Sequence, residues 1–186
     1  MEAELVTRAQ EGDREAFANL ATMTYGRLHR VAQNILSDVD RADDATQQAV
    51  VDIWRKLPQL RDPARFEAWS YRIVVNCCYA EVRKCRHWLP GIECDHDEDP
   101  QAAQAITGVV YRDALERAFR RLPLEQRAVV VLHHYLSLPL REVAAVLGIP
   151  EGTAHSRLSR AKAVLRAALE ADARVADGAP APERVR

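Results

Sequence analysis

The sequence predicts an all-α protein made of two small helical domains joined by a flexible acidic linker. Apolar residues recur at three- and four-residue spacing through most of the 186 residues, which is the period of a buried helix face. Pro, Gly and acidic residues stand where these periodic runs begin and end. Between residues 89 and 108 the periodicity stops, and five acidic residues occur without any Lys or Arg. We therefore expect a linker there, with one domain on each side.

The first domain is expected to span residues 1–88. A Gly-Asp pair at 12–13 is typical of a helix end followed by a new N-cap. Two further helices are predicted over 38–57 and 62–88, each opening at an Asp, the second with Pro in its first turn. The helix that follows the Gly-Asp pair is expected to bury a stripe of Phe17, Leu20, Thr24, Leu28, Val31 and Ile35.

The second domain is expected to span residues 109–170, where helical periodicity resumes. The run Val129–Leu132 suits a buried strand by propensity, but its polar neighbours and the lack of a partner strand favour helix. The tail over 171–186 is rich in Ala, Pro and charge and is expected to be disordered. The helices predicted in this domain cover about 109–122, 124–136, 140–147 and 151–170.

Composition excludes several classes of protein. The apolar content of 48% is enough for a packed core and excludes a wholly disordered chain. The acidic N-terminus does not resemble an export signal, and no apolar run approaches the ~18 residues of a membrane span. We therefore expect a cytoplasmic protein without membrane contact. Because the sequence shows no nucleotide-binding loop, no Ser-His-Asp set and no paired carboxylates, we expect neither an enzyme nor a cofactor.

The net charge of −1 hides an uneven distribution along the chain. Residues 1–64 carry 8 basic and 11 acidic side chains, and residues 65–88 carry 5 and 2. After the acidic linker, residues 109–169 carry 10 basic and 5 acidic side chains. Two basic surfaces joined by an acidic tether suggest two contacts with one long polyanion. Ordinary solvated helix faces explain the charges equally well.

The most specific motif is a helix-turn-helix over residues 140–161. Gly148 is expected to end its first helix, and Ile149-Pro150 to form the turn. The second helix is expected to bury Ala154, Leu158, Ala161 and Leu165, which leaves a basic outer face with no acid before Glu170. A polar, cationic helix of this kind can enter the DNA major groove. The alternative is a helical hairpin that packs and binds nothing.

At these residues the sequence resembles the extracytoplasmic-function (ECF) class of RNA polymerase sigma factors, in the sigma-70 family. Where the family usually has Gly, Ser and an aromatic before the motif, this chain has Ser137, Pro139 and Leu140. The residues that match the family pattern are Leu122, Pro123, Arg127, Glu142, Val143, Ala144, Leu147, Gly148, Ile149, Pro150, Gly152, Thr153, Ser156, Arg157, Leu158, Arg160 and Ala161. The resemblance implies a transcription initiation factor that binds core RNA polymerase and directs it to promoter DNA.

The resemblance also implies where each contact lies. Residues 1–88 correspond to sigma region 2, which binds the β′ clamp helices and opens the −10 element. Residues 109–170 correspond to region 4, which binds the β flap and reads the −35 element. The implied polymerase-binding residues are Asp43, Asp44, Gln47, Gln48 and Trp54. The implied DNA-binding residues are Arg72, Asn76, Arg83, Lys84 and Arg86 in region 2, and Thr153, His155, Ser156, Arg157, Arg160 and Lys162 in region 4.

The same residues have plainer interpretations. Without the resemblance, the acidic-amide face is an ordinary solvated helix face, and Phe66 and Trp69 are core residues. The chain also departs from the family at Gln48, which replaces an acid, and at His155, where Lys is common. An anti-sigma factor is a further partner that the resemblance allows.

Four further residues form a Cys-x-His pair on each side of a short gap. Cys85, His87, Cys94 and His96 are ligand types that zinc accepts, but the spacing is not a common zinc pattern. Incidental thiols in an exposed linker are the alternative, so we assign no metal ligand. The rival functions are therefore a helix-turn-helix regulator that acts without core polymerase, and a zinc or thiol sensor.

Overall fold

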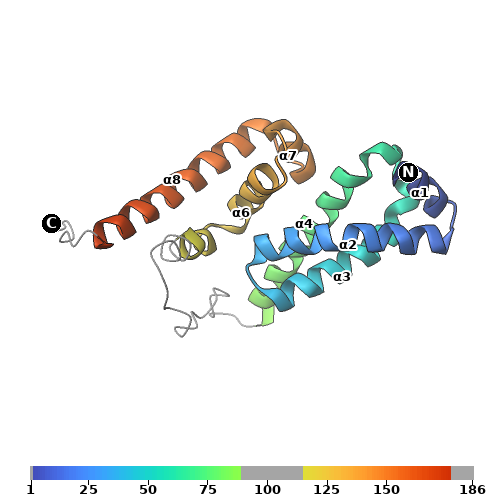
Figure 1. Ribbon diagram of the computed structural model, residues 1–186, viewed down its shortest axis with the longest axis horizontal. Coiled ribbons are helices and arrows are strands. Elements are labelled where there is room, and N and C mark those ends of the chain that lie inside the picture. The colour runs from blue at the N-terminus through green and yellow to red at the C-terminus, as the bar shows by residue number, and fades with distance from the viewer. Residues whose placement is uncertain (1, 89–114, 177–186) are drawn as a thin grey trace.

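A computed structural model of the chain describes residues 2–88 and 115–176, with side chains described over 2–84 and 115–171. Every regular element in these ranges is helical, which confirms the all-α prediction (Figure 1). The elements fall into two groups, one on each side of the undescribed segment. The run Val129–Leu132 is helical, as its polar neighbours indicated.

The first domain is a bundle of four helices. Its core is formed where α2, α3 and α4 pack on one another, while α1 covers one side of α2 (Figure 1). Short 3₁₀ turns at Leu57–Gln59 and Pro63–Arg65 carry the chain from α3 to α4. The helices are α1 (Glu2–Gln10), α2 (Arg14–Leu36), α3 (Val39–Lys56) and α4 (Phe66–Trp88).

Three acidic caps set the helix starts in this domain, at the positions that the sequence predicted. The Asp13 carboxylate accepts hydrogen bonds from the Glu15 and Ala16 amides at 2.9 and 3.0 Å. Asp38 and Asp62 cap the elements that follow them in the same way. Each carboxylate satisfies amides that have no partner within the helix, and each lies at the positive end of the helix dipole.

The buried stripe of α2 differs from the predicted one at its first position. Leu20, Thr24, Leu28, Val31 and Ile35 are buried as predicted, but Phe17 is only half-buried and Ala16 takes the core position. The prediction of Phe17 as a core residue was therefore wrong in part. The Phe17 side chain packs at the edge of the core, and the neighbouring Ala16 is the residue that points into it. The Phe17 ring packs on Trp54 of α3.

The second domain begins with a helical stretch over 115–120. It continues with α6 (Leu124–Val130), a π-helical turn (Val131–Tyr135), α7 (Leu140–Leu147) and α8 (Glu151–Ala176). Both α6 and α7 pack against α8. Two predicted boundaries need correction. The helix expected over 124–136 widens into the π turn after Val130, and α8 extends to Ala176, six residues into the tail that was expected to be disordered.

The helix-turn-helix forms where the sequence placed it. Gly148 ends α7 in the left-handed conformation at φ 65°, and its amide donates to the carbonyls of Ala144 and Ala145. Ser137, which stands where the family usually has Gly, is also left-handed at φ 56°. The following turn is held by contact of His133 Nδ1 with the Leu138 carbonyl at 2.8 Å. Among the helices of the described ranges, none combines the length and apolar character needed to cross a membrane.

Candidate nucleic-acid and protein interfaces

The outward face of α3 joins polar and apolar side chains. Asp44, Gln47 and Gln48 are exposed along it, as predicted. Val51 and Trp54 continue the same face at helical spacing and are 42% and 39% exposed. A large apolar surface on the solvent side of a helix is typical of a protein contact. The sequence reasoning included Trp54 but missed Val51, although an apolar residue on the polar side of a helical wheel was the available signal.

Trp54 is held in place by a neighbour from another helix. The Phe17 ring of α2 lies 4.6 Å from the Trp54 ring, centroid to centroid, at an interplanar angle of 57°. Tilted aromatic pairs of this kind are favourable beyond their area burial. Phe17 therefore belongs to the α3 surface as the support of Trp54, a role that its sequence position did not reveal.

The acidic side chains of α3 are not equivalent. The Asp43 carboxylate turns toward α2, where its Oδ1 lies 2.8 Å from His29 Nε2. Asp52 accepts from Lys56 Nζ at 2.6 Å and from Gln48 Nε2 at 2.9 Å, and the Lys56 contact is the main cause that lowers the pKa of Asp52. Asp44 makes no ion pair with any of the described residues, so its charge is available to a partner.

A second exposed face runs along α4. Arg72, Asn76 and Arg83 are exposed at intervals of four and seven residues, so the helix brings these three predicted DNA-binding residues to one side. Lys84 is also exposed and pairs with Glu81, which raises the pKa of Lys84. The fifth predicted residue, Arg86, lies in α4, but its side chain is outside the described residues.

The aromatic residues at the start of α4 divide between core and surface. Phe66 is buried, as the plainer interpretation held. Trp69 is half-buried, with its ring 6.1 Å from that of Phe66. Trp69 lines a cleft of about 960 Å³ between α4 and the α7 side of the second domain.

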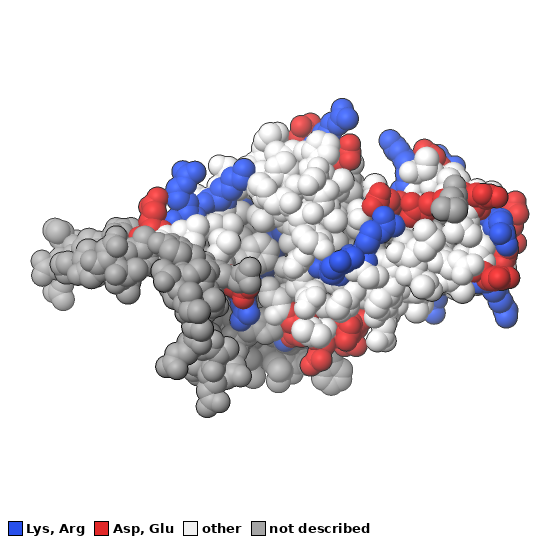
Figure 2. All heavy atoms as spheres, viewed as in Figure 1, with Lys and Arg blue, Asp and Glu red and all other residues white. Residues whose placement is uncertain are grey.

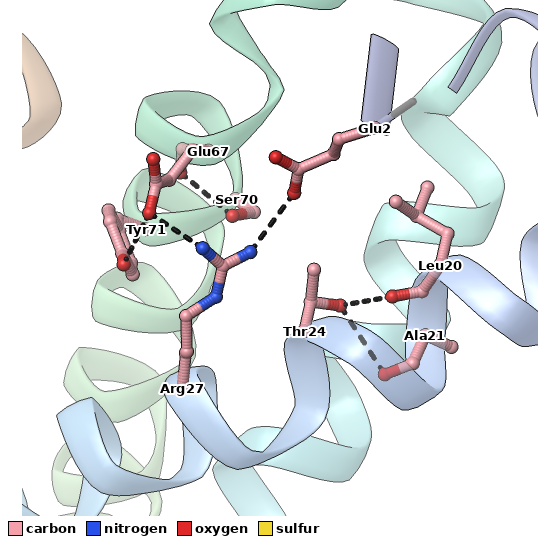
Figure 3. A network of polar contacts seen from close by, with 8 residues as sticks. All are labelled: Glu2, Leu20, Ala21, Thr24, Arg27, Glu67, Ser70 and Tyr71. Carbon is pink, nitrogen blue, oxygen red and sulfur yellow. Dashed lines mark hydrogen bonds and ion pairs between the residues drawn. The ribbon is translucent and has the colours of Figure 1, made fainter. Parts of the chain in front are cut away.

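A polar network fixes the first turns of α4 (Figure 3). Arg27 of α2 donates to Glu2 of α1 at 3.0 Å and to Glu67 of α4 at 2.9 Å. The Tyr71 hydroxyl donates to the same Glu67 carboxylate at 3.0 Å. Burial is the main cause that raises the pKa of Tyr71 to about 12, so this hydroxyl stays protonated as a donor. One guanidinium thus orients α4 against both α1 and α2.

The third face is that of α8, the second helix of the helix-turn-helix. His155, Arg160 and Lys162 are exposed, as predicted, and Ser159 lies exposed between them. The sequence reasoning missed Ser159, whose signal was its position four residues after His155. Figure 2 shows a few Lys and Arg side chains projecting over α8, whereas side chains of both charges are mixed at the end that carries α1.

The other three predicted residues of α8 are half-buried. The Ser156 hydroxyl donates to the Thr153 carbonyl at 3.0 Å and is therefore occupied within the helix. Arg157 lies close enough to Tyr79 of α4 to counteract part of the rise in the pKa of that tyrosine. Arg157 therefore lies near α4 of the first domain.

Comparison with known proteins decides between the rival functions. Residues 20–88 match the family Sigma-70 region 2, and residues 112–165 match Sigma-70, region 4. The ECF RNA polymerase sigma factor SigM of Mycobacterium tuberculosis is 36% identical over 165 residues, which cover 88% of this chain and 82% of SigM. The chain belongs to the ECF sigma factors of the sigma-70 family.

Another relative agrees with this membership, and two solved structures share the fold. The ECF sigma-E factor of Escherichia coli K12 is 30% identical to this sigma factor over 85% of its length and 88% of the relative. The structure of CnrH in complex with the cytosolic domain of CnrY has a TM-score of 0.67 and 26% identity, covering 92% of this chain and 98% of that chain. The RpoE structure from Bartonella quintana, in complex with the anti-sigma factor NepR, has a TM-score of 0.65 at 23% identity, covering 83% and 96%.

Membership answers most of the questions that the sequence left open. The sigma factor is a transcription initiation factor, and the match of residues 20–88 to region 2 disfavours a regulator that has only the helix-turn-helix. Within the described residues, no three His, Cys, Asp or Glu side chains are grouped as metal ligands. Of the predicted ligand pairs, the side chains of Cys85 and His87, and all of Cys94 and His96, lie outside those residues.

Proposed function

We propose that this sigma factor binds core RNA polymerase through the exposed face of α3 and directs it to promoters through α4 and α8. The observation that carries the proposal is the position of the three exposed faces. The α3 and α4 faces lie within the segment that matches region 2, and the start of α8 lies within the segment that matches region 4. Its relatives SigM and SigW are RNA polymerase sigma factors by name.

The α3 face suits a basic protein partner with an apolar spot. It exposes one carboxylate, that of Asp44, and two side-chain amides, those of Gln47 and Gln48. Exposed apolar area lies beside them on Val51 and Trp54. Interfaces commonly centre on an aromatic residue surrounded by polar groups. We assign this face to the β′ clamp helices of the polymerase, and Asp43 to a supporting role because its carboxylate turns toward His29.

The α4 and α8 faces suit nucleic acid. Arg72, Arg83 and Lys84 supply cations for the backbone near the −10 element, and Asn76 supplies an amide that can bond a base edge. On α8, His155, Arg160 and Lys162 are exposed and can enter the major groove of the −35 element. These roles require no catalytic group of the sigma factor itself, since the polymerase performs the chemistry in the cytoplasm.

Proteins that bind the sigma factor itself are a further class of partner. The CnrH structure is of a complex with the cytosolic domain of CnrY, and it covers 92% of this chain. That resemblance supports an anti-sigma factor as a partner of this chain.

Run-off transcription with core polymerase and a genomic promoter library tests the proposal. The wild-type chain should yield discrete transcripts that core polymerase alone does not make. Asp44→Arg should weaken recovery of core polymerase in a pull-down at least tenfold, because it reverses a charge on the proposed contact. Glu11→Arg is the matched control, since it makes the same change at an exposed site outside α3. Equal recovery with both variants would refute the assignment of this face, and the absence of any specific transcript would refute the function.

A further inference from the structure

The first helix of the chain lies outside both segments that match the sigma-70 family. α1 spans Glu2–Gln10, whereas the match to region 2 begins at residue 20. Family membership therefore leaves the role of α1 open. One side of this helix belongs to the core of the first domain, because Val6 is fully buried and Ala9 is only 3% exposed. The polar side chains at its two ends reach residues that are far away in the sequence.

The last residue of α1 holds the connection between α3 and α4. The side-chain amide nitrogen of Gln10, Nε2, donates to the carbonyl of Leu57 at 3.0 Å and to the carbonyl of Leu60 at 2.6 Å. Leu57 begins the first 3₁₀ turn of this connection, and Leu60 directly follows it. α1 also packs against both 3₁₀ turns (Figure 1). Both N–H groups of one amide are thus used to fix one corner of the bundle.

The other end of α1 is linked to the start of α4. Glu2 accepts a hydrogen bond from Arg27 of α2 at 3.0 Å, and the same guanidinium donates to Glu67, in the first turn of α4, at 2.9 Å. Figure 3 shows this guanidinium between the two carboxylates. The Tyr71 hydroxyl donates to Glu67 as well, at 3.0 Å, from one turn further along α4. Arg27 therefore connects α1 to two successive turns of α4.

The part of α4 that is held in this way precedes the residues that the proposed function gives to DNA. Arg72 directly follows Tyr71, and Asn76 lies one turn later. Successive residues of a helix keep a fixed angle to one another, so a rotation of α4 that releases Glu67 would also turn Arg72 and Asn76. The direction of these two side chains thus depends on contacts that α1 makes or supports.

We propose that α1 is a positioning element for promoter opening, in which Gln10 and Arg27 hold α4 in the orientation that strand separation requires. The inference rests on the proposed function, because it takes Arg72 and Asn76 as DNA contacts. Gln10 and Arg27 are positioning residues, since they act through the carbonyls and carboxylates that they hold. Neither residue contacts DNA or polymerase in this role.

The proposal separates two steps of initiation. Binding of core polymerase is assigned to the exposed face of α3, and it should not depend on the α1 contacts. Opening of the promoter depends on the direction of α4, and it should depend on them. Loss of one neutral hydrogen bond shifts an equilibrium about fivefold, so loss of both Gln10 bonds should slow opening about five- to twentyfold.

The test compares variants in the polymerase holoenzyme on two templates of one promoter. One template is fully paired, and in the other the −10 region is already unpaired by mismatches. Gln10→Met removes both donors, while it keeps the length of the side chain and its helix propensity. Gln33→Met is the matched control, because Gln33 is exposed on α2 and its side chain makes no hydrogen bond with any of the described residues. Permanganate reactivity of thymines follows opening, and run-off transcripts are measured on both templates.

Gln10→Met should open the paired template about five- to twentyfold more slowly than wild type. On the pre-opened template it should transcribe at nearly the wild-type level, and its recovery of core polymerase in a pull-down should be unchanged. Gln33→Met should match wild type in all three measurements. Arg27→Met provides a second variant if Gln10→Met fails to fold. Arg27→Lys should regain part of the opening rate, because an ammonium group can still bind one of the two carboxylates.

The possible outcomes separate the two proposals. Opening at the wild-type rate by Gln10→Met and Arg27→Met overturns the positioning role. Equal losses on the paired and the pre-opened template overturn it too, because they indicate a general loss of folded sigma factor. Slow opening by Gln33→Met to the same extent also contradicts it. If the wild-type chain with core polymerase yields no specific transcript from either template, the proposed function fails, and the positioning role fails with it.

Discussion

Ser137 adopts a left-handed backbone conformation at φ 56°, which costs an L-residue with a Cβ roughly 1–2 kcal/mol and costs glycine nothing. We predict that Ser137→Gly stabilises the chain, because relief of this strain exceeds the roughly 0.5–1 kcal/mol of extra backbone entropy that glycine loses. The midpoint of thermal or urea unfolding should rise. Ser137→Ala keeps the strain and should not raise the midpoint, and an equal gain from both variants would contradict this explanation.

The thiols of Cys77 and Cys78 are both buried in α4. Burial is the main cause that raises the pKa of Cys77 to about 11, and it raises the pKa of Cys78 further. At pH 8 the fraction of Cys77 present as thiolate is then on the order of one in a thousand. Because the thiolate is the reactive form, we predict that iodoacetamide labels both cysteines far more slowly in the native chain than in urea. Time-resolved mass spectrometry of the α4 peptide gives both rates, and native labelling as fast as in urea would contradict the prediction.

The same pKa shift has a consequence for stability. The folded-state pKa of Cys77 lies above its unfolded value of 9.0, so the folded chain holds its proton more tightly. The contribution to stability is therefore complete below about pH 9 and is lost as the pH rises toward 11. A Cys77→Ala variant should show a smaller loss of stability over that window.

At the scale of single elements, we expect two arginines of the recognition helix α8 to contact DNA in different ways. An Arg that reads a base edge contributes about 1–3 kcal/mol of discrimination, whereas a phosphate contact weakens binding to all sequences and lowers the salt slope by about one. We predict that Arg157→Ala loses affinity mainly for particular base-pair variants, and that Arg160→Ala loses affinity for all of them. Binding of both variants to a set of single-base promoter changes at several salt concentrations measures this. A uniform loss by Arg157→Ala would make it a phosphate contact.

Helix boundaries were predictable where a local interaction sets them. The caps Asp13, Asp38 and Asp62 and the end of α7 at Gly148 follow from preferences of a few neighbouring residues. The two helices of the helix-turn-helix were equally predictable, because the spacing of neighbouring apolar and turn residues encodes this motif. The positions that could not be predicted depend on a second element: Phe17 packs on Trp54 of α3, and Arg157 lies near Tyr79 of α4. Periodicity assigns a side chain to a face, but not to the partner that covers that face.

At the scale of the whole molecule, the continuous core predicts cooperative unfolding. Buried residues of both domains form one apolar cluster, and Arg127 caps α2 across the boundary. We therefore predict a single calorimetric transition for the wild-type chain, with calorimetric and van't Hoff enthalpies that agree. Tyr79→Asn should split or broaden this transition, because each domain then unfolds more independently. Two well-separated transitions in the wild type would contradict a shared core.

The placement of two tryptophans gives the sigma factor its own optical reporters. Trp54 is 39% exposed on the α3 face, so its emission should shift to shorter wavelength when a partner covers that face and removes water from the indole. Trp69 lines the cleft between the domains, so its emission should shift to longer wavelength when the cleft opens. Phe variants of each residue in turn, with Trp88 also replaced by Phe, would separate the two signals. The rate of polymerase binding and the rate of domain separation can then be compared in one unlabelled protein.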